Sequence, residues 1–427
     1  MTIHERLSSL GLRFPSVLIP ADTVDLQRWA VIACDQFTSD PAYWKSVEEY
    51  VGEAPSTLHI IHPEIYLTRE DPARAAARIQ RAMNQLRENG SLREVPSSAV
   101  LAERRLPSGT VRHGLVLAVD LDAYDYRPET AALIRASEET IPDRLPPRAE
   151  IRRGATLETP HVLVLYNDPG DSLLAPLKGA KSSLEKLYET PLMMEGGSIA
   201  GYRIPLEDSL AEAILQPLEA LREGNLLFAT GDGNHSLAAA KEVWTSRKAA
   251  GAAPDDPFRY CLVELVNVYD PGLPFHPIHR IGLAGKSALV ATLEKITGGT
   301  ARTFTRQAFL EAFLHRGVPE ASVGILDREG GVLLEIPAGG PLAVAAADQA
   351  LAETGARGID YVHGNAEACE AADRAGGLAL LLPEFPRDQL FPTVAARGTL
   401  PRKAFSLGEA RDKRYYLECR SLTSKED

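Results

Sequence analysis

Apolar residues recur along this chain in two patterns, short continuous runs and helically spaced positions. Short runs at 113–121, 160–166 and 225–230 have the length and composition of buried strands. Between 72 and 89 the apolar positions follow a helical period instead, and Asn89-Gly90 comes next as a helix-ending signal. Because such strands and helices alternate along the chain, the pattern predicts a mixed α/β (α+β) fold.

The alternation continues to the C-terminus and suggests three segments. Residues 58–61 are a further predicted strand, and the last third combines predicted helices near 286–297 and 306–316 with strands near 322–327, 331–336, 378–382 and 414–420. We expect an N-terminal α/β segment over 1–200, a core over 201–285 and a C-terminal α/β segment over 286–427. No obvious linker sequence marks either boundary.

Composition and charge narrow the range of functions. The chain has 427 residues, of which 44% are hydrophobic and 24% charged, as is typical of a globular protein with two or three structural units. Its formal net charge is -12 and it contains no long block of Lys and Arg, so nucleic acid is an unlikely partner.

The distribution of apolar residues and cysteines points to the cytoplasm. No run of about 18 apolar residues occurs that would span a membrane. No apolar signal-peptide core follows Met1. The four cysteines form no CxxC pair, so we expect reduced thiols in a cytoplasmic protein.

The densest group of chemically active side chains lies at Gly231-Asp232-Gly233-Asn234-His235-Ser236. The predicted strand at 226–230 leads into this hexapeptide, and a predicted helix over 234–249 follows. A strand–glycine–helix junction can bind an anion, because the first N–H groups of a helix lack intrahelical partners and its N-terminus is partly positive. Glycines also let a ligand approach the backbone closely. We therefore expect Gly231, Gly233, Asn234 and Ser236 to bind phosphate.

Asp232 and His235 are candidates at this junction for roles in metal binding and proton transfer. A carboxylate beside a phosphate is repulsive unless it holds Mg²⁺ or accepts a proton from a substrate hydroxyl, and Asp232 is a candidate for either role. His235 is a candidate to contact phosphate or to transfer a proton near neutral pH. The alternative is a purely structural tight turn, with Asn234 or Asp232 capping the helix.

Several motifs together resemble the family catalogued as domain of unknown function 1015 (DUF1015), and the resemblance covers most of the chain. They are Trp29 to Ser39, Ala54 to Leu58, Glu158 to His161, Gly231 to Ser236, Phe275 to Arg280, Ile359 to Gly364 and Leu400 to Ser406.

That family is similar, more distantly, to the ParB/free-serine-kinase fold group, whose Asp-Gly-His-His-Arg motif helps to bind nucleotide phosphates. The resemblance implies a ParB/serine-kinase-like core over 201–285, with Asp232, Gly233 and His235 in matching positions. Asn234 replaces the first His of the motif, and Ser236 replaces its Arg. Losing that Arg removes a bidentate phosphate clamp, so another cation would have to take its place. The candidates are Arg280, Arg402 and Lys403.

In the serine kinases of that group a Glu upstream of the motif resembles the base for the serine hydroxyl. Glu207 is the nearest candidate here, although it also suits a helix N-terminus. The resemblance thus implies phosphoryl transfer from a nucleotide, ATP or ADP, to a small hydroxyl substrate such as free serine, assisted by Mg²⁺ at Asp232. In this hypothesis Asp232, His235 and Glu207 are catalytic.

Two other functions are considered beside this one. The strand at 115–119 runs into Asp120-Leu121-Asp122, which resembles the nucleophile motif of haloacid-dehalogenase-like phosphatases, and Gly231-Asp232-Gly233 resembles their metal loop. Tyr124 and Ser236 depart from that pattern. The other alternative is a protein that binds a nucleotide or phospho-metabolite at the same junction without turnover.

Three further side chains have both a structural and a functional interpretation. Asp35 ends an apolar strand and either points into a cleft or caps a loop. His161 opens the predicted strand at 160–166, where we favour a structural role. His279 is three residues from His276, but no third and fourth metal ligand can be identified for this pair.

Overall fold

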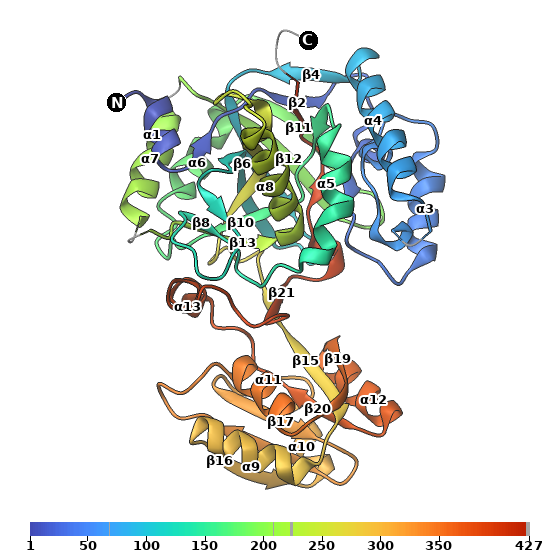
Figure 1. Ribbon diagram of the computed structural model, residues 1–427, viewed down its shortest axis with the longest axis vertical. Helices are drawn as coiled ribbons and strands as arrows, with labels where there is room; N and C mark the ends of the chain where they lie inside the picture. The colour runs from blue at the N-terminus through green and yellow to red at the C-terminus, as the bar shows by residue number, and fades with distance from the viewer. Residues whose placement is uncertain (68, 208, 223–224, 424–427) are drawn as a thin grey trace. The chain divides into compact units, whose positions relative to one another are not determined.

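The chain folds into two compact units in the computed structural model, which describes residues 1–67, 69–207, 209–222 and 225–423 (Figure 1). Unit 1 comprises Met1–Leu273, Phe391–Thr399 and Gly408–Asp427. Unit 2 comprises Pro274–Leu390 and Leu400–Leu407. Each unit therefore combines segments that are distant in sequence.

Unit 1 is built on a ten-stranded mixed sheet in the order β11-β12-β5-β6-β14-β10-β13-β8-β7, with β1 paired to β6. The neighbours β10 and β14 are parallel, whereas β10 and β13 are antiparallel. The strands are β1 (Leu12–Arg13), β5 (Ser98–Arg105), β6 (Val111–Asp120), β7 (Tyr124–Asp125), β8 (Ile134–Arg135), β10 (Leu163–Tyr166), β11 (Lys186–Pro191), β12 (Ser198–Pro205), β13 (Phe228–Asp232) and β14 (Tyr260–Asn267).

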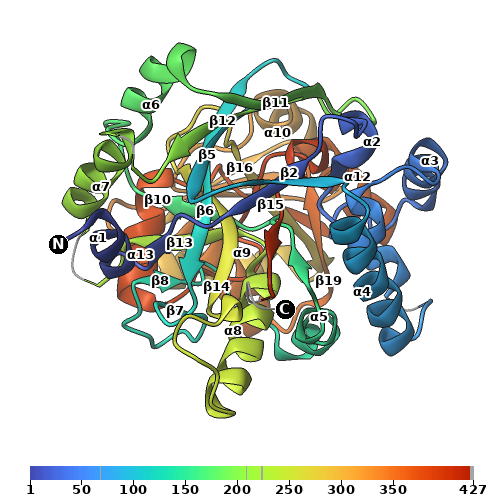
Figure 2. The same cartoon turned by 90° about the horizontal axis from the view of Figure 1, so that it is seen from above.

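Helices cover this sheet, which explains why its central strands are continuously apolar. Strand β6 buries every residue from Leu115 to Val119, as expected for a strand packed on both faces. Helices α5 and α8 pack against each other along one margin in Figure 2, and α6 and α7 lie at another. The helices of unit 1 are α1 (Ile3–Ser9), α2 (Leu26–Trp29), α3 (Pro41–Val51), α4 (Pro72–Glu88), α5 (Leu145–Arg153), α6 (Leu174–Ala180), α7 (Ser209–Leu221) and α8 (Asn234–Ala249).

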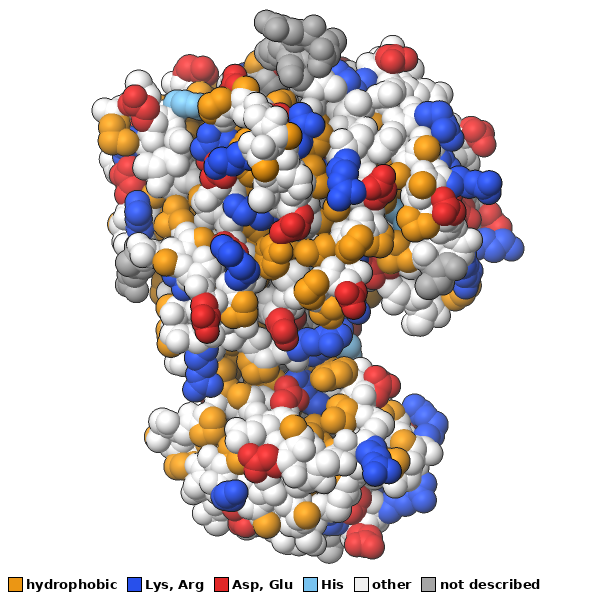
Figure 3. Space-filling model, viewed as in Figure 1, with side chains coloured by type: hydrophobic (Ala, Val, Ile, Leu, Met, Phe, Trp, Pro, Cys, Tyr) orange, Lys and Arg blue, Asp and Glu red, His pale blue; other side chains and the backbone are white. Residues whose placement is uncertain are grey.

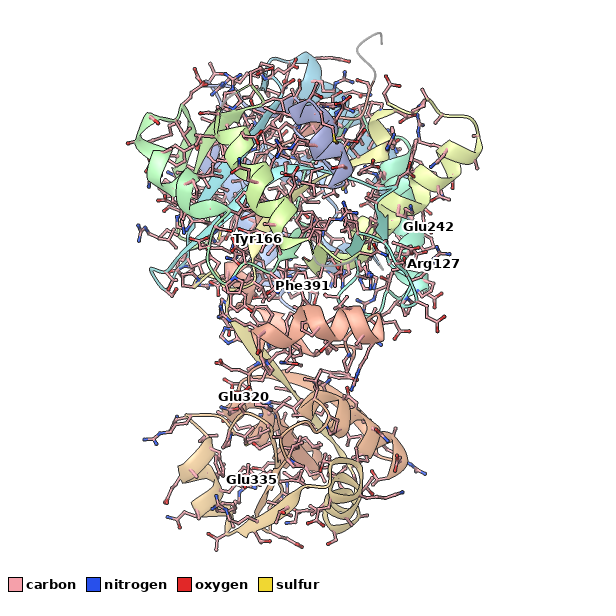
Figure 4. The ribbon with its side chains drawn as sticks, turned by 90° about the vertical axis from the view of Figure 1, so that its left-hand side faces the viewer. Arg127, Tyr166, Glu242, Glu320, Glu335 and Phe391 are labelled. Atoms are coloured by element: carbon pink, nitrogen blue, oxygen red, sulfur yellow. The ribbon has the colours of Figure 1, made fainter. Side chains whose placement is uncertain are left out.

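The outer side of α8 is tied to the loop that follows β7. Glu242 on α8 and Arg127 in that loop lie on the same side of unit 1 (Figure 4). The Tyr126 hydroxyl donates to the Glu242 carboxylate at 2.7 Å. The helix is thus held on its exposed face as well as on the face that packs on the sheet.

Short strand pairs supplement this sheet, and two of them join the C-terminal segment to the N-terminal half of unit 1. They are β2 (Val17–Pro20) with β4 (Leu92–Val95), β3 (Val31–Ile32) with β22 (Tyr415–Tyr416), and β9 (Leu157–Glu158) with β23 (Arg420–Ser421). Arg414 directly precedes β22 and forms buried ion pairs with Glu264 and Glu418. The last residues of the described chain are therefore part of the core of unit 1.

Unit 2 has a separate antiparallel sheet in the order β16-β18-β17-β20-β15-β19, with β21 paired to β15. Its strands are β15 (Phe275–Leu283), β16 (Thr300–Phe304), β17 (Ser322–Leu326), β18 (Gly331–Glu335), β19 (Arg357–His363), β20 (Leu378–Leu381) and β21 (Phe405–Leu407). Its helices are α9 (Lys286–Thr297), α10 (Arg306–Phe313), α11 (Ala343–Glu353) and α12 (Asn365–Ala375), and α13 (Leu390–Arg397) begins where the chain returns to unit 1.

These observations confirm the mixed α/β fold. They place the segment boundaries differently, because the boundary expected near 200 falls inside β12, and β12 to β14 share one sheet with the N-terminal strands. The division expected near 285 lies between Leu273 and Pro274 instead. The predicted strand at 58–61 is wrong, since Thr57–Ile60 is a 3-10 helix.

The distribution of charge on the surface and the length and polarity of the helices are consistent with the composition of the sequence. Acidic and basic side chains are interspersed on the face seen in Figure 3. Over the part of the chain that the structure describes, every helix is too short or too polar to cross a lipid bilayer.

Candidate functional site

The junction between β13 and α8 has the strand–glycine–helix form that was predicted. Strand β13 ends at Asp232, Gly233 has a left-handed backbone (φ 75°, ψ 23°), and α8 begins at Asn234. A Cβ atom on Gly233 would lie 3.0 Å from Val162 Cγ2 and 3.1 Å from Val162 Cα. Both the backbone angle and the crowding therefore favour glycine at this position.

Polar contacts hold the first turn of α8 to the sheet. The Thr230 hydroxyl donates to Asn234 Oδ1 and accepts the Ser137 N–H at 3.2 Å. His235 Nε2 accepts the Ile141 N–H at 3.2 Å. That nitrogen consequently carries no proton, so His235 does not offer a proton to a ligand there.

Asp232 lies at the end of β13 and pairs with a lysine from the C-terminal segment. Lys413 Nζ is 3.1 Å from Asp232 Oδ2, and the two side chains are 10% and 19% exposed. The Gly233 N–H also donates to Asp232 Oδ1 at 3.0 Å. This ion pair puts a cation at the N-terminus of α8, where the sequence motif lacks its expected Arg.

Ser236 and His161 form a hydrogen-bonded pair next to the junction. Ser236 Oγ is 3.0 Å from His161 Nε2, and His161 Nδ1 is 3.1 Å from the Tyr416 hydroxyl. Tyr416 is 2% exposed and its hydroxyl accepts the Cys34 N–H at 3.1 Å. The sequence favours a structural role for His161, but the structure places its ring in a hydrogen-bonded chain between Ser236 and Tyr416.

Burial keeps His161 neutral, whereas the polar and charged neighbours of Asp35 keep that carboxyl ionised. Burial lowers the pKa of His161, although the negative charges of Asp35 and Asp232 work in the opposite direction. Burial alone would raise the pKa of Asp35, but His161, Gln36 and Lys413 more than compensate and lower it. A neutral imidazole therefore lies in the field of two carboxylates.

A cavity of about 170 Å³ opens beside Ser236 and His161. Its walls are largely apolar, and two ion pairs, Arg148–Glu64 and Arg152–Glu158, contribute polar groups to the lining. Cys34 also lines the cavity, and burial raises the pKa of its thiol to about 11, so Cys34 is not a thiolate at neutral pH. The cavity has the size for a small molecule rather than a nucleotide.

Glu207 is not brought to this site. It is exposed in the turn after β12, and β12 is separated from β13 in the sheet by β5, β6, β14 and β10. Neighbouring strands are about 4.8 Å apart, so five such steps lie between the two strands. Glu207 is thus near the motif in the sequence but distant from it in the fold.

The three predicted cations Arg280, Arg402 and Lys403 belong to unit 2, whereas the junction belongs to unit 1. Arg280 is fully buried and pairs with Asp348 at 2.8 Å. It also donates to the backbone carbonyls of Ile278, Arg402 and Lys403. The Arg280 guanidinium is therefore engaged in holding the 402–403 backbone, and the side chains of Arg402 and Lys403 are exposed.

The residues of the phosphatase-like motif are engaged elsewhere. Asp120 pairs with Arg259 at 2.6 Å, and Asp122 pairs with Lys248 at 2.9 Å and accepts the Trp244 indole N–H. Strand register aligns Asp232 with Leu163, Glu264 and Val116, so Asp120 lies four residues further along β6. The two halves of that motif do not form one site.

Among the described residues there is no cluster of three or more His, Cys, Asp or Glu side chains placed to hold a metal ion. His279 is buried, and its Nδ1 accepts the Leu382 N–H at 3.1 Å.

Comparisons with known proteins identify the family of this chain. A sequence model of the family described as "Protein of unknown function (DUF1015)" matches residues 16–327. No curated protein matches the chain significantly.

Three solved structures illustrate the loose structural likeness. A mutant free serine kinase in complex with AMP has a TM-score of 0.37 at 11% identity, over 72% of this chain and 92% of the other. A conserved hypothetical protein from Pyrococcus furiosus has a TM-score of 0.32 at 10% identity, over 71% and 90%. C-terminally truncated SbnI from Staphylococcus aureus has a TM-score of 0.36 at 10% identity, over 69% and 82%.

Proposed function

Because the chain belongs to the DUF1015 family of proteins of unknown function, its chemistry has to follow from its own residues, and we propose that unit 1 is a nucleotide-dependent phosphotransferase. Its acceptor is a small hydroxyl compound such as free serine. The observation that carries this proposal is the β13–α8 junction, where the left-handed Gly233 begins a 16-residue helix beside the Lys413 ammonium group.

Phosphate binding at this junction is supported by two sources of positive charge. The N-terminus of α8 carries the partial charge of the helix dipole. Lys413 adds a full charge, and a charge-assisted hydrogen bond contributes about 1.5–3 kcal/mol. In this proposal the backbone at Gly231 to Asn234 and the Ser236 side chain contact the phosphate, and Lys413 takes the place of the missing arginine.

The Asp232 carboxylate is suited to bind a magnesium ion that enters the site together with the nucleotide. Mg²⁺ is commonly held by one or two carboxylates together with substrate phosphates and water. Asp232 supplies one such carboxylate, and within the described residues no cluster supplies the several ligands of a resident metal site. The bound ion would neutralise phosphate charge during transfer.

The acceptor side of the reaction is supported by the cavity next to Ser236. A base has to reach the hydroxyl that attacks phosphorus. His161 is neutral and lines the cavity, whereas Glu207 lies on a distant strand. His161 therefore replaces Glu207 as the proposed base.

A non-catalytic nucleotide or phospho-metabolite binding protein is the second candidate. The observation that favours it is Ser236, which replaces the arginine of the related motif and removes a charge that would stabilise transferring phosphate. Turnover distinguishes the two candidates, since both bind the same ligand.

The test is calorimetric titration of ATP, ADP, AMP and CTP, each with Mg²⁺, into the wild-type chain and Asp232→Asn. We expect saturable binding of at least one nucleotide, weakened in Asp232→Asn because the carboxylate for Mg²⁺ is lost. A phosphorylation assay with free serine and other small alcohols follows. Absence of binding up to millimolar nucleotide would refute the proposed function, and binding without turnover would select the second candidate.

A further inference from the structure

Ser236 has the surroundings of a nucleophile rather than those of a phosphate ligand alone. It is the third residue of α8, its Oγ is 3.0 Å from His161 Nε2, and both side chains line the cavity of about 170 Å³. We infer that Ser236 accepts the phosphoryl group first, so that transfer proceeds through a phosphoserine at this position. This inference rests on the proposed function and specifies its reaction path.

The position of Ser236 on the helix favours negative charge at its oxygen. The first turn of a helix stabilises an anion through its N–H groups and its dipole. Gly233, with its left-handed backbone, allows β13 to turn directly into α8. The Ser236 hydroxyl is thereby presented at the end of a strand, next to the proposed phosphate position.

His161 is placed to act as the base for Ser236. When the imidazole proton is on Nδ1 it is donated to the Tyr416 oxygen at 3.1 Å, and Nε2 is left to accept the Ser236 hydroxyl proton. Burial lowers the pKa of His161 and keeps it neutral before reaction. The carboxylates of Asp35 and Asp232 stabilise the imidazolium that forms when the proton is transferred.

The first step conserves atoms and charge. Ser236 Oγ attacks the terminal phosphorus of the nucleoside triphosphate, the Oγ–P bond forms, and the bond from phosphorus to the bridging oxygen breaks. The serine proton passes to His161 Nε2 and then to the departing diphosphate.

The second step returns the enzyme to its starting state. The hydroxyl of a small acceptor in the cavity attacks the phosphoserine, its proton passes to His161 Nε2, and Ser236 Oγ leaves with that proton. A cavity near 150 Å³ can hold benzene, so the observed space suits an acceptor of only a few heavy atoms and not the donor nucleotide.

The inference is tested by covalent labelling of the full chain with two probes, ATP with Mg²⁺ and an alkyl fluorophosphonate. The fluorophosphonate reports the nucleophile without a nucleotide, because Ser236 Oγ displaces fluoride from its phosphorus. The variants are Ser236→Ala and His161→Gln. The matched control is Ser246→Ala, because the Ser246 hydroxyl donates within α8 to the Glu242 carbonyl. Melting temperatures verify that each variant is folded.

We expect wild type and Ser246→Ala to gain one phosphoryl group from ATP at the peptide containing Ser236, and one phosphonyl group from the second probe. Ser236→Ala should gain neither while still binding nucleotide. His161→Gln should label at least about a hundredfold more slowly, as expected for loss of a general base. In wild type the labelling rate should be flat near neutral pH and fall only in acid, as His161 becomes protonated.

Two results would overturn the inference in distinguishable ways. If Ser236→Ala binds nucleotide and phosphorylates acceptors at the wild-type rate, transfer is direct and only the phosphoserine is refuted. If the wild-type chain neither binds nucleotide nor reacts with either probe, the proposed function fails together with the inference.

Discussion

His279 illustrates how one buried side chain can control the stability of unit 2. It is fully buried on β15, its Nδ1 accepts the Leu382 N–H, and burial lowers its pKa from 6.5 to about 4. In the unfolded chain the same group binds a proton already near pH 6.5. Between these two pKa values the unfolded state therefore binds a proton that the native state does not bind. The free energy of unfolding of unit 2 consequently falls as the pH drops from 6.5 toward 4.

We predict that His279 lowers the free energy of unfolding of unit 2 by about 3 kcal/mol as the pH falls from 6.5 to about 4. Each unit of pKa difference corresponds to about 1.4 kcal/mol. His279→Asn keeps an acceptor for the Leu382 N–H but does not titrate. Urea unfolding followed by circular dichroism at several pH values measures the effect. A variant that loses stability with acid as steeply as wild type would contradict the assignment.

Ser236 and Lys413 show which parts of the site a sequence can predict. The residue types at Gly231 to Ser236 indicate an anion site because the signal is local, and β13 and α8 follow it as expected. Lys413 and His161 are 181 and 75 positions away from their partners Asp232 and Ser236. No local pattern connects such residues, because only the packing of β22 on β3 and the start of β10 brings them there.

At the scale of elements, the β13–α8 turn depends on Gly233 for two separate reasons. An L-residue in the left-handed region costs roughly 1–2 kcal/mol. A Cβ atom would in addition crowd the Val162 backbone and lie 3.3 Å from His161 Cδ2. Gly251, after the end of α8, also has a positive φ (89°), but open space surrounds its Cβ position.

The pair of variants Gly233→Ala and Gly251→Ala separates these two contributions. We expect Gly251→Ala to destabilise unit 1 by about 1 kcal/mol, and Gly233→Ala to destabilise it by more, because Val162 and His161 have to move. Chemical unfolding followed by tryptophan fluorescence gives both values. Equal losses in the two variants would show that the crowding is relieved without cost.

The sequence pattern at residues 58–61 is compatible with more than one type of secondary structure. Residues 58–61 were predicted as a strand, yet Thr57–Ile60 is a 3-10 helix capped by the Ser56 hydroxyl at the Leu58 N–H. A short apolar run is buried in either conformation, so periodicity does not distinguish them. The predicted helices at 72–89 and 286–297 were identified within a residue, because their apolar positions repeat over several turns.

At the scale of the whole molecule, the two units have separate hydrophobic cores. The sequence did not reveal this division, because the chain passes between the units without a linker of distinctive composition. The three tryptophans, Trp29, Trp44 and Trp244, are all buried in unit 1. Their fluorescence therefore reports unit 1 alone, whereas circular dichroism reports both units.

We predict that acid unfolds unit 2 before unit 1, because His279 destabilises unit 2 in the acidic range. Circular dichroism should then lose part of its signal at a pH where tryptophan fluorescence is still native. The same comparison with His279→Asn should bring the two transitions closer together. Coincident transitions in the wild-type chain would mean that the units unfold as one cooperative system.

We propose that nucleotide phosphate binds at the N-terminus of α8 beside Lys413. The most direct measurement is titration of ATP with Mg²⁺ into wild type, Lys413→Met and the control Lys45→Met, whose side chain on α3 is 76% exposed. We expect saturable binding that Lys413→Met weakens at least about tenfold, the equivalent of about 1.4 kcal/mol, while Lys45→Met leaves it unchanged. If binding is absent, or is equally strong in Lys413→Met, nucleotide phosphate does not bind beside Lys413.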